Sequence, residues 1–506
     1  MALEKANPAK KAPKWGFGFF EKSHSWMSFA LVVGCALSIV YLLQSMVVNR
    51  NNCMSFNPLP SIIAESAPSN ISSEHKLGSS PPQARINPKG TELSRIVFAI
   101  AGAARNWPVR KEYIRIWYNS AKNVRAIMWF DEKVNGTWEK DAPPFRISED
   151  ISRFPISRGK LAVTRIARIV SETFRLGLPD VDWFIMGDDD TFFFPGNVAK
   201  VLAKYDPTRM WYIGSNSESQ SQDVSHSFNM AFGGGGFAIS YVLAEALAKM
   251  QDSCLLRYSR LWGSDERVYA CMSELGVSLT HELGFHQMDI VGNAMGLLAA
   301  HPQAPLVSLH HIDWIDPIFP NFNRHKSLHH LLQAAKVESS SLFQQSICYA
   351  DGQNWSISVS WGYVVQAYKW FVPPRELESP LLTFRTIKRR SDRSEFRLNV
   401  REIPNDLCLL PTLYYMQSVT GPSNQTEGLL ESVYMREVNP KRAACDKRMH
   451  PLNLVQRIRV LKEPVADSWF QAPRRSCCSV KAWGNDTVEL RLLACREGET
   501  LTSNLH

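Results

Sequence analysis

The feature that most constrains this chain is an acidic cluster set inside an apolar stretch, DWFIMGDDDTFFF, at Asp182–Phe194. The run WFIM is typical of a short buried strand, and it leads through Gly187 directly into three aspartates. Adjacent carboxylates repel one another, and burying them is costly unless a cation compensates their charge. Because alternate residues of an extended segment point the same way, Asp188 and Asp190 share one side. We therefore predict that they hold a divalent cation, in preference to the alternative of a solvated acidic turn.

The segments around this cluster alternate between strand-like and helix-like patterns. Continuous apolar runs at Arg95–Gly102 and Val124–Phe130 precede the WFIM strand, and helical spacing follows Pro108 and spans Arg158–Arg175. This alternation is typical of a mostly parallel sheet that helices cover on both faces. Ligands of such sheets bind beyond the carboxyl ends of the strands, where the aspartates lie. We therefore expect an α/β fold with its site at that edge.

Four consecutive glycines, Gly233 to Gly236, precede a further apolar strand in the sequence FGGGGFAIS. The strand-like segment Met210–Ser215 comes shortly before them. Glycines at such a place remove side chains, so that a ligand or another part of the backbone can approach closely. A flexible loop is the alternative, which the flanking Phe232 and Phe237 disfavour.

Two later segments carry ionisable residues. In LWGSDERVYACM, Asp265 and Glu266 stand at the start of a predicted helix, where a capping aspartate is the plainest explanation. In PLVSLHHIDWIDP, His310 and His311 stand beside Asp313 at the end of an apolar segment. Lone histidines are usually structural, but a pair in a chain with a carboxylate cluster makes one of the two a candidate metal ligand.

The N-terminal part of the chain predicts a membrane anchor. Residues 26–48 form an uncharged apolar stretch whose length matches a bilayer-spanning helix. Five lysines precede it and only Arg50 follows closely, so the positive-inside rule places residues 1–25 in the cytosol and the remainder in the lumen. A cleaved signal peptide would have a shorter apolar core and a clear cleavage site. We predict an uncleaved signal anchor, followed by a flexible stem at residues 49–93 that is rich in Ser, Pro and Asn.

The remaining chain divides by composition. Residues 94–335 carry the α/β pattern, whereas Trp355–Phe371 and Thr487–Glu497 alternate in the manner of half-buried strands. We therefore predict a smaller, β-rich, disulfide-containing region at residues 336–506. Nine of the ten cysteines follow the membrane segment, where an oxidising lumen permits disulfides. The sequence contains no CxxC pair, so we predict no zinc site. Sequence alone leaves the pairing of the six C-terminal cysteines open. Five N-x-S/T sequons lie after the membrane segment and suggest N-glycosylation.

Together the anchor, the stem, WFIMGDDDTFF, the WYIG strand, GGGGFAIS, the DER helix and the late HH pair resemble the Fringe-type glycosyltransferases of glycosyltransferase family 31. Fringe and the core 1 galactosyltransferase share this order of motifs, and the resemblance is closest to the plant Fringe-related branch, which is labelled as a domain of unknown function. It covers about Ser94 to Phe319. It implies a GT-A fold, a UDP-sugar donor, a divalent cation that is usually manganese, and transfer with inversion, commonly in β1,3 linkage.

The resemblance also implies roles for the acidic cluster and the histidines. Asp190 resembles the metal-binding aspartate of the motif, and Asp188 and Asp189 would contact the metal, the ribose or the donor sugar. His311, or His310 one residue away, resembles the metal-binding histidine. Removing Asp190 is expected to leave the fold stable, because it takes away a repelling charge. The implied donor pocket further includes Arg105, Gly234 and Gly235.

The resemblance further implies a base and a disulfide. Asp265 resembles the catalytic base that precedes a helix in Fringe and the core 1 enzyme. The second acidic partner often found beside this base is replaced by Ser264 on one side and Glu266 on the other, so either carboxylate is a candidate. Cys254 and Cys271 flank this segment, and because the core 1 enzyme carries a comparable pair, we predict a disulfide between them.

The residue patterns and the resemblance together predict a type II membrane protein of the Golgi. Its lumenal domain is expected to move a hexose or N-acetylhexosamine from a UDP-sugar to a hydroxyl group of a glycan or glycoprotein. The alternatives are a metal-dependent lumenal hydrolase, and a catalytically silent lectin or scaffold on the same fold. The net charge of +9 is modest for 506 residues and the basic residues are scattered, so we predict no nucleic-acid partner.

Overall fold

The computed structural model describes Ser38 and residues 91–155, 161–350, 354–390, 392–440, 445, 450–484 and 486–503. The predicted cytosolic tail, the membrane anchor apart from Ser38, and most of the stem therefore lie outside the described residues. Within the described ranges, no helix combines the length and the apolar character that crossing a bilayer requires. Residues 84–506 form one compact unit, and the description below concerns this unit alone.

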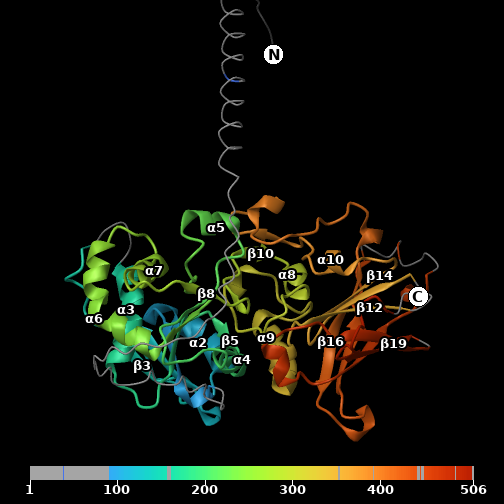
Figure 1. The fold of residues 1–506 in the computed structure, drawn as a ribbon, viewed down its shortest axis with the longest axis horizontal. Helices are drawn as coiled ribbons and strands as arrows, with labels where there is room; N and C mark the ends of the chain where they lie inside the picture. The colour runs from blue at the N-terminus through green and yellow to red at the C-terminus, as the bar shows by residue number, and fades with distance from the viewer. Residues whose placement is uncertain are drawn as a thin grey trace, which may run out of the picture. The chain divides into compact units, whose positions relative to one another are not determined.

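A seven-stranded sheet forms the centre of the first half of this unit (Figure 1). Strand β1 pairs in parallel with β2 and β4, whereas β7 runs antiparallel to its neighbours β4 and β6. The prediction of a mostly parallel sheet is confirmed, with β7 as the exception. In spatial order the strands are β3 (Phe145–Ile147), β2 (Arg125–Phe130), β1 (Ile96–Ala101), β4 (Trp183–Asp188), β7 (Phe237–Ser240), β6 (Tyr212–Gly214) and β8 (Leu279–His281).

Helices cover both faces of this sheet. Successive residues of β1 point to opposite sides, so they pack into two different cores. On one side Phe98 packs against Trp117 of α2, with ring centroids 5.3 Å apart, in the core that also contains α4. On the other side Val97 lies in the core formed with α3, α6 and α7. Burial on both sides explains why the β1 sequence is continuously apolar. The helices are α2 (Trp107–Trp117), α3 (Leu161–Arg175), α4 (Pro195–Leu202), α6 (Tyr241–Arg257) and α7 (Ser264–Glu274).

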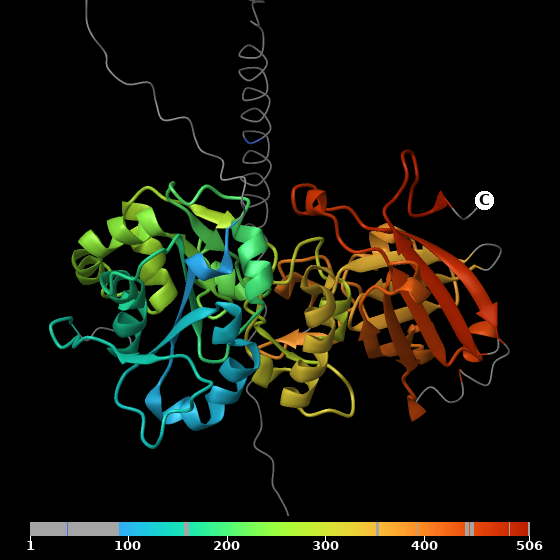
Figure 2. The same ribbon diagram turned by 90° about the horizontal axis from the view of Figure 1, so that it is seen from below.

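The second half of the unit is β-rich, as predicted, and contains an eight-stranded sheet. All of its neighbouring strands run antiparallel except β18 and β20. Helices α8 (Met295–Ala299) and α9 (Arg324–Glu338), drawn in yellow, lie between the two sheets in Figures 1 and 2, and α9 contacts both α2 and β16. In spatial order the strands are β12 (Gln345–Tyr349), β13 (Ser356–Ser360), β14 (Val364–Tyr368), β16 (Thr412–Thr420), β17 (Leu430–Arg436), β18 (Arg457–Lys462), β20 (Thr487–Leu493) and β19 (Cys477–Gly484).

The prediction of half-buried strands was wrong for Trp355–Phe371. This segment forms the β13–β14 hairpin, and every residue of both strands is buried. The alternating serines of β13 suggest a solvent-exposed face in the sequence, but their hydroxyls form hydrogen bonds inside the protein. Ser356 Oγ donates to the Trp370 carbonyl, and Ser360 Oγ donates to the Leu298 carbonyl. In β20, by contrast, buried and partly exposed residues alternate as predicted.

One disulfide of the described residues lies in the first half of the unit and three lie in the second. Cys254 of α6 and Cys271 of α7 are bonded with Cα atoms 5.8 Å apart, which confirms the predicted pair. This bond ties α7, and with it the segment that carries Asp265, to the long helix α6. The pairs that the sequence left open are Cys348–Cys478, Cys408–Cys445 and Cys477–Cys495.

Candidate active site

The acidic cluster lies at the carboxyl end of β4, as the sequence predicted. The strand ends at Asp188, and β5 (Phe192–Phe193) returns the chain to the core. Thr191 closes the turn between them, because its N–H donates to the Asp188 carbonyl and its Oγ1 accepts from the Asp188 N–H. The same hydroxyl donates to the Gly234 carbonyl at 2.7 Å. The aspartate turn is therefore held on two sides.

Asp188, Asp190 and His310 form a group that could hold a metal ion, since one ligand atom from each lies within 4.8 Å of the others. These three residues are called the metal-type group below. His310 Nε2 is 3.1 Å from Asp190 Oδ1 and 3.8 Å from Asp188 Oδ2. Strand β11 (Ser308–Leu309) pairs with β5, and this pairing carries the next residue, His310, to the aspartate turn. Two carboxylates and one imidazole suit several divalent cations.

His311 does not join this group. Its Nδ1 lies 3.1 Å from Asp289 Oδ1, and its ring stacks on Trp314. Of the two histidines that the sequence left open, His310 is therefore the one that meets the aspartates.

Arg110 is a site residue that sequence reasoning missed. It projects from α2, and its guanidinium Nη1 lies 2.8 Å from Asp190 Oδ2 and 2.7 Å from Asp313 Oδ2. Tyr113, one turn later, donates its hydroxyl to Asp313. Arg110 stands far from the aspartates in the sequence, in an ordinary amphipathic helix, so no local pattern marks it. The predicted basic residue, Arg105, lies in the short helix η2 (Ala104–Asn106) with an exposed side chain.

The three aspartates differ in how readily they ionise. Burial raises the pKa of Asp188 to about 7, and the charges of Asp190 and Asp265 act in the same direction. Burial and the two neighbouring aspartates likewise raise the pKa of Asp189 to about 7. Burial also acts against Asp190, but the hydrogen bond and charge of His310, with the charge of Arg110, outweigh it and lower its pKa to about 2. Burial and mutual repulsion thus oppose the ionisation of Asp188 and Asp189, which a bound cation would favour.

The glycine run packs against the site, and the predicted close approach of another part of the backbone is confirmed at Gly235. A Cβ atom on Gly234 would lie 2.1 Å from the His310 ring, and one on Gly233 would lie 2.7 Å from Asp265 Oδ1. A Cβ on Gly235 would meet the backbone of Gln287 at 3.0 Å. The groups that approach these buried glycines are therefore parts of the same chain. The run places the metal-type group and Asp265 side by side.

Gly234→Ala is expected to displace His310 and to weaken metal binding at least about 10-fold. The added methyl group would overlap the imidazole, and overpacking of this kind typically costs about 1–3 kcal/mol of stability. Manganese titration and thermal unfolding of the variant test both effects. Gly196→Ala is the matched control, because a Cβ there meets nothing within 4 Å. Unchanged metal affinity in Gly234→Ala would show that His310 is not a ligand.

Asp265 and Glu266 have different partners, although they are adjacent. Glu266 Oε2 accepts from the N–H of Gly263, the residue that caps α7, and Glu266 Oε1 lies 3.0 Å from His226 Nδ1. Asp265 Oδ2 instead accepts from the Gly233 N–H at 3.0 Å, and burial raises its pKa. The capping role belongs to Glu266, and Asp265 faces the glycine run.

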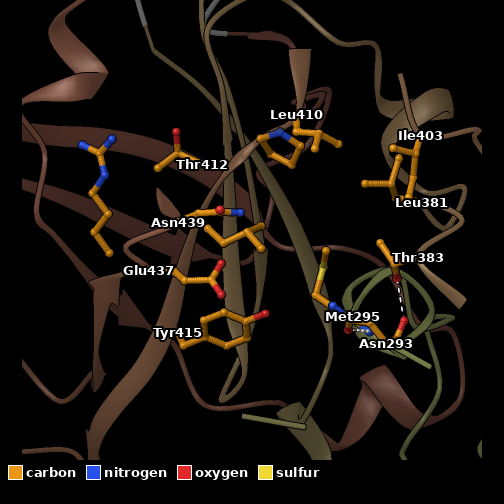
Figure 3. A pocket seen from close by; sticks show the side chains of 13 residues that line it. Asn293, Met295, Leu381, Thr383, Ile403, Leu410, Thr412, Tyr415, Glu437 and Asn439 are labelled. Atoms are coloured by element: carbon orange, nitrogen blue, oxygen red, sulfur yellow. Dashed lines mark hydrogen bonds between the residues drawn. The ribbon is translucent and has the colours of Figure 1, made fainter. Parts of the chain in front are cut away.

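Two cavities of the described residues lie away from the aspartate turn. One of about 200 Å³ opens between α8 and the C-terminal sheet, and Thr383 and Asn293 are hydrogen-bonded in its wall (Figure 3). Another of about 660 Å³ includes Ser217, whose hydroxyl donates to Asp289, the partner of His311. The metal-type group lines neither cavity, so side-chain chemistry and not cavity size identifies the candidate site.

The fold and this site define an α/β protein with a carboxylate–histidine group of metal-binding type at a strand end. Residues 222–478, just over half of the chain, match the family described as "Protein of unknown function, DUF604", and the chain belongs to this family. A Mus musculus protein named beta-1,3-glucosyltransferase is 26% identical over 219 residues. The match covers 42% of this chain and 43% of that relative, so it spans less than half of the relative's length. Together the two matches confirm the resemblance to the Fringe-type glycosyltransferases.

Proposed function

We propose that this protein is an inverting glycosyltransferase with a GT-A fold. It moves a hexose or N-acetylhexosamine from a UDP-sugar to a hydroxyl group of a glycan or glycoprotein, in β1,3 linkage and with manganese as its cation. The observation that carries the proposal is the group of Asp188, Asp190 and His310 at the end of β4, with Asp265 held close by across the glycine run. The name of the mouse relative supports the linkage and makes glucose the first sugar to test.

The residues of the group fit a divalent cation. Three ligand atoms lie within 4.8 Å of one another, and Asp189 Oδ2 is buried without a hydrogen-bond partner among the described residues. Asp188, Asp190 and His310 would hold the ion. When bound, the cation supplies Lewis-acid stabilisation of the charge that develops on the leaving diphosphate.

The other residues act on the two ends of the reacting bond. In addition to the cation, Arg110 places a positive charge beside Asp190, where it attracts the diphosphate of the donor. Asp265 receives the proton of the attacking hydroxyl, because each of its oxygens accepts one hydrogen bond and keeps capacity for another. Its raised pKa makes it a stronger base than an exposed carboxylate. A single displacement with the base opposite the leaving group inverts the anomeric carbon.

Arg105, Asp189, Gly234 and Gly235 complete the proposed donor pocket. The proposed setting is the Golgi membrane, with residues 26–48 as a type II anchor and residues 94–335 as the lumenal catalytic domain. Its support is the lysine asymmetry around the apolar stretch. Digestion of the catalytic domain by protease added outside sealed Golgi vesicles would contradict this topology.

The function is tested by following UDP release from UDP-glucose, UDP-galactose, UDP-N-acetylglucosamine and UDP-N-acetylgalactosamine over a glycan acceptor array. We expect release from one of these donors that requires both manganese and an acceptor. Equal release in water alone would identify a hydrolase. Glycan binding without consumption of any donor would identify a lectin. Either result would contradict the transferase.

A further inference from the structure

Three aromatic rings stand in a row beside the metal-type group. The rings of His310 and His311 have centroids 3.8 Å apart, and the rings of His311 and Trp314 have centroids 4.0 Å apart with only 3° between their planes. Trp314 is nevertheless 45% exposed. Because His311 covers one indole face, the exposed surface belongs to the opposite face and the edges. Among the described residues, no other aromatic ring packs on Trp314.

The backbone of this row is strained at His311, and a close polar contact and a buried hydrogen bond of Asp289 lie behind it. His311 has a φ of 50°, in the left-handed region that is unfavourable for a residue with a Cβ atom. Such strain persists where the surroundings hold it, and it gathers at ligand sites. Here Asp289 Oδ1 lies 3.1 Å from His311 Nδ1, and Ser217 donates to the other Asp289 oxygen at 2.6 Å. The indole therefore rests on a rigid support.

Trp314 and Asp265 lie on opposite sides of His310. The space that a Gly234 side chain would fill is taken by the His310 ring, so Gly234 covers one face of that ring and His311 covers the other. Gly233, next to Gly234, holds Asp265. The order across the site is thus Asp265, the glycines, His310, His311 and Trp314.

We propose that the open face of Trp314 stacks against the nucleobase of the nucleotide-sugar donor. This inference rests on the proposed function. The anomeric carbon of the donor must face Asp265, and the nucleoside is attached to the far end of the diphosphate, so it leaves the metal-type group on the side away from Asp265. A flat aromatic base matches a flat indole whose second face is already covered, and such stacking strengthens binding without specific hydrogen bonds.

The neighbour of Trp314 supports this direction. Asp313 accepts hydrogen bonds from Arg110 and Tyr113, and both of these residues lie on α2, the helix that follows β1. Trp314 is therefore anchored to the same βα unit whose arginine lies beside the aspartates.

The test is the dissociation constant of UDP for the whole protein, measured by calorimetry with manganese present. We expect Trp314→Ala to weaken UDP binding about 5- to 150-fold, and Trp314→Phe to restore most of it, because phenylalanine keeps a stacking face. Manganese affinity without nucleotide should stay the same in both variants. The matched control is Trp262→Ala, since Trp262 is 65% exposed but precedes α7 on the Asp265 side, and it should bind UDP normally.

Several outcomes would overturn the inference. Unchanged UDP affinity in Trp314→Ala would do so and would leave the proposed function standing. A higher acceptor KM in Trp314→Ala with unchanged UDP affinity would assign the indole to the acceptor. Equal losses in Trp314→Ala and Trp314→Phe would exclude stacking as the cause. If the unmodified protein failed to bind UDP with manganese, both the inference and the proposed function would fall.

Discussion

Asp265→Asn is expected to lower turnover about 10²–10⁴-fold, because the variant loses the group that accepts the proton of the attacking hydroxyl. Asparagine has nearly the same shape as aspartate, and its side-chain oxygen can still accept from the Gly233 N–H at the place of Asp265 Oδ2. Stability and UDP affinity should therefore change little. Initial rates with saturating donor and acceptor, together with UDP calorimetry, measure the two effects separately.

Glu266→Gln is the control for this prediction. Glu266 accepts from the Gly263 N–H at 2.7 Å, and glutamine at the third position of a helix can make the same bond. The variant loses the charge beside His226, so a small loss of stability is expected with turnover close to normal. Near-normal turnover in Asp265→Asn would make Asp265 structural, and a collapse only in Glu266→Gln would move the base to Glu266.

Asp190→Asn is expected to reduce manganese affinity by at least about 100-fold. Even the loss of an outer partner of a metal ligand typically costs about 10–100-fold, and Asp190 contributes an atom to the metal-type group itself. UDP binding in the presence of manganese should fall with it. Manganese titration followed by electron paramagnetic resonance gives the affinity. Asp180→Asn is the matched control, since its side chain is 82% exposed and its left-handed φ of 53° suits asparagine.

The stability of Asp190 variants is where the structure corrects the sequence. The aspartate was expected to be a repelling charge whose removal costs little. Its pKa is instead lowered to about 2, because contacts with His310 and Arg110 overcome the cost of burial. Replacing it leaves these partners without their carboxylate, which costs on the order of 1–3 kcal/mol. Unfolding in urea without metal should show this loss, and unchanged stability would restore the repulsion argument.

Local sequence was sufficient for the architecture around the site. The apolar run WFIM, interrupted by Gly187 and three aspartates, predicted a buried strand that ends at a polar edge, and β4 ends at Asp188. The run of glycines predicted the close approach of a ligand or another part of the backbone, and the Gln287 backbone makes such an approach at Gly235. These features depend on the alternation of neighbouring residues, and such alternation responds to burial within a few residues. The same alternation wrongly predicted a half-buried strand at β13. That strand is buried on both faces, and its serine hydroxyls form hydrogen bonds inside the protein.

The sequence by itself determined the order of strands and helices around the site, the sheet edge that carries the aspartates, and the resemblance to the Fringe-type glycosyltransferases. Only the tertiary structure decided which residues meet at that edge. The β5–β11 pairing selects His310 and leaves His311 with Asp289, and helix α2 delivers Arg110. The capping bond of Glu266 separates it from Asp265. These choices depend on register and packing between segments far apart in the chain, and no local periodicity encodes such contacts.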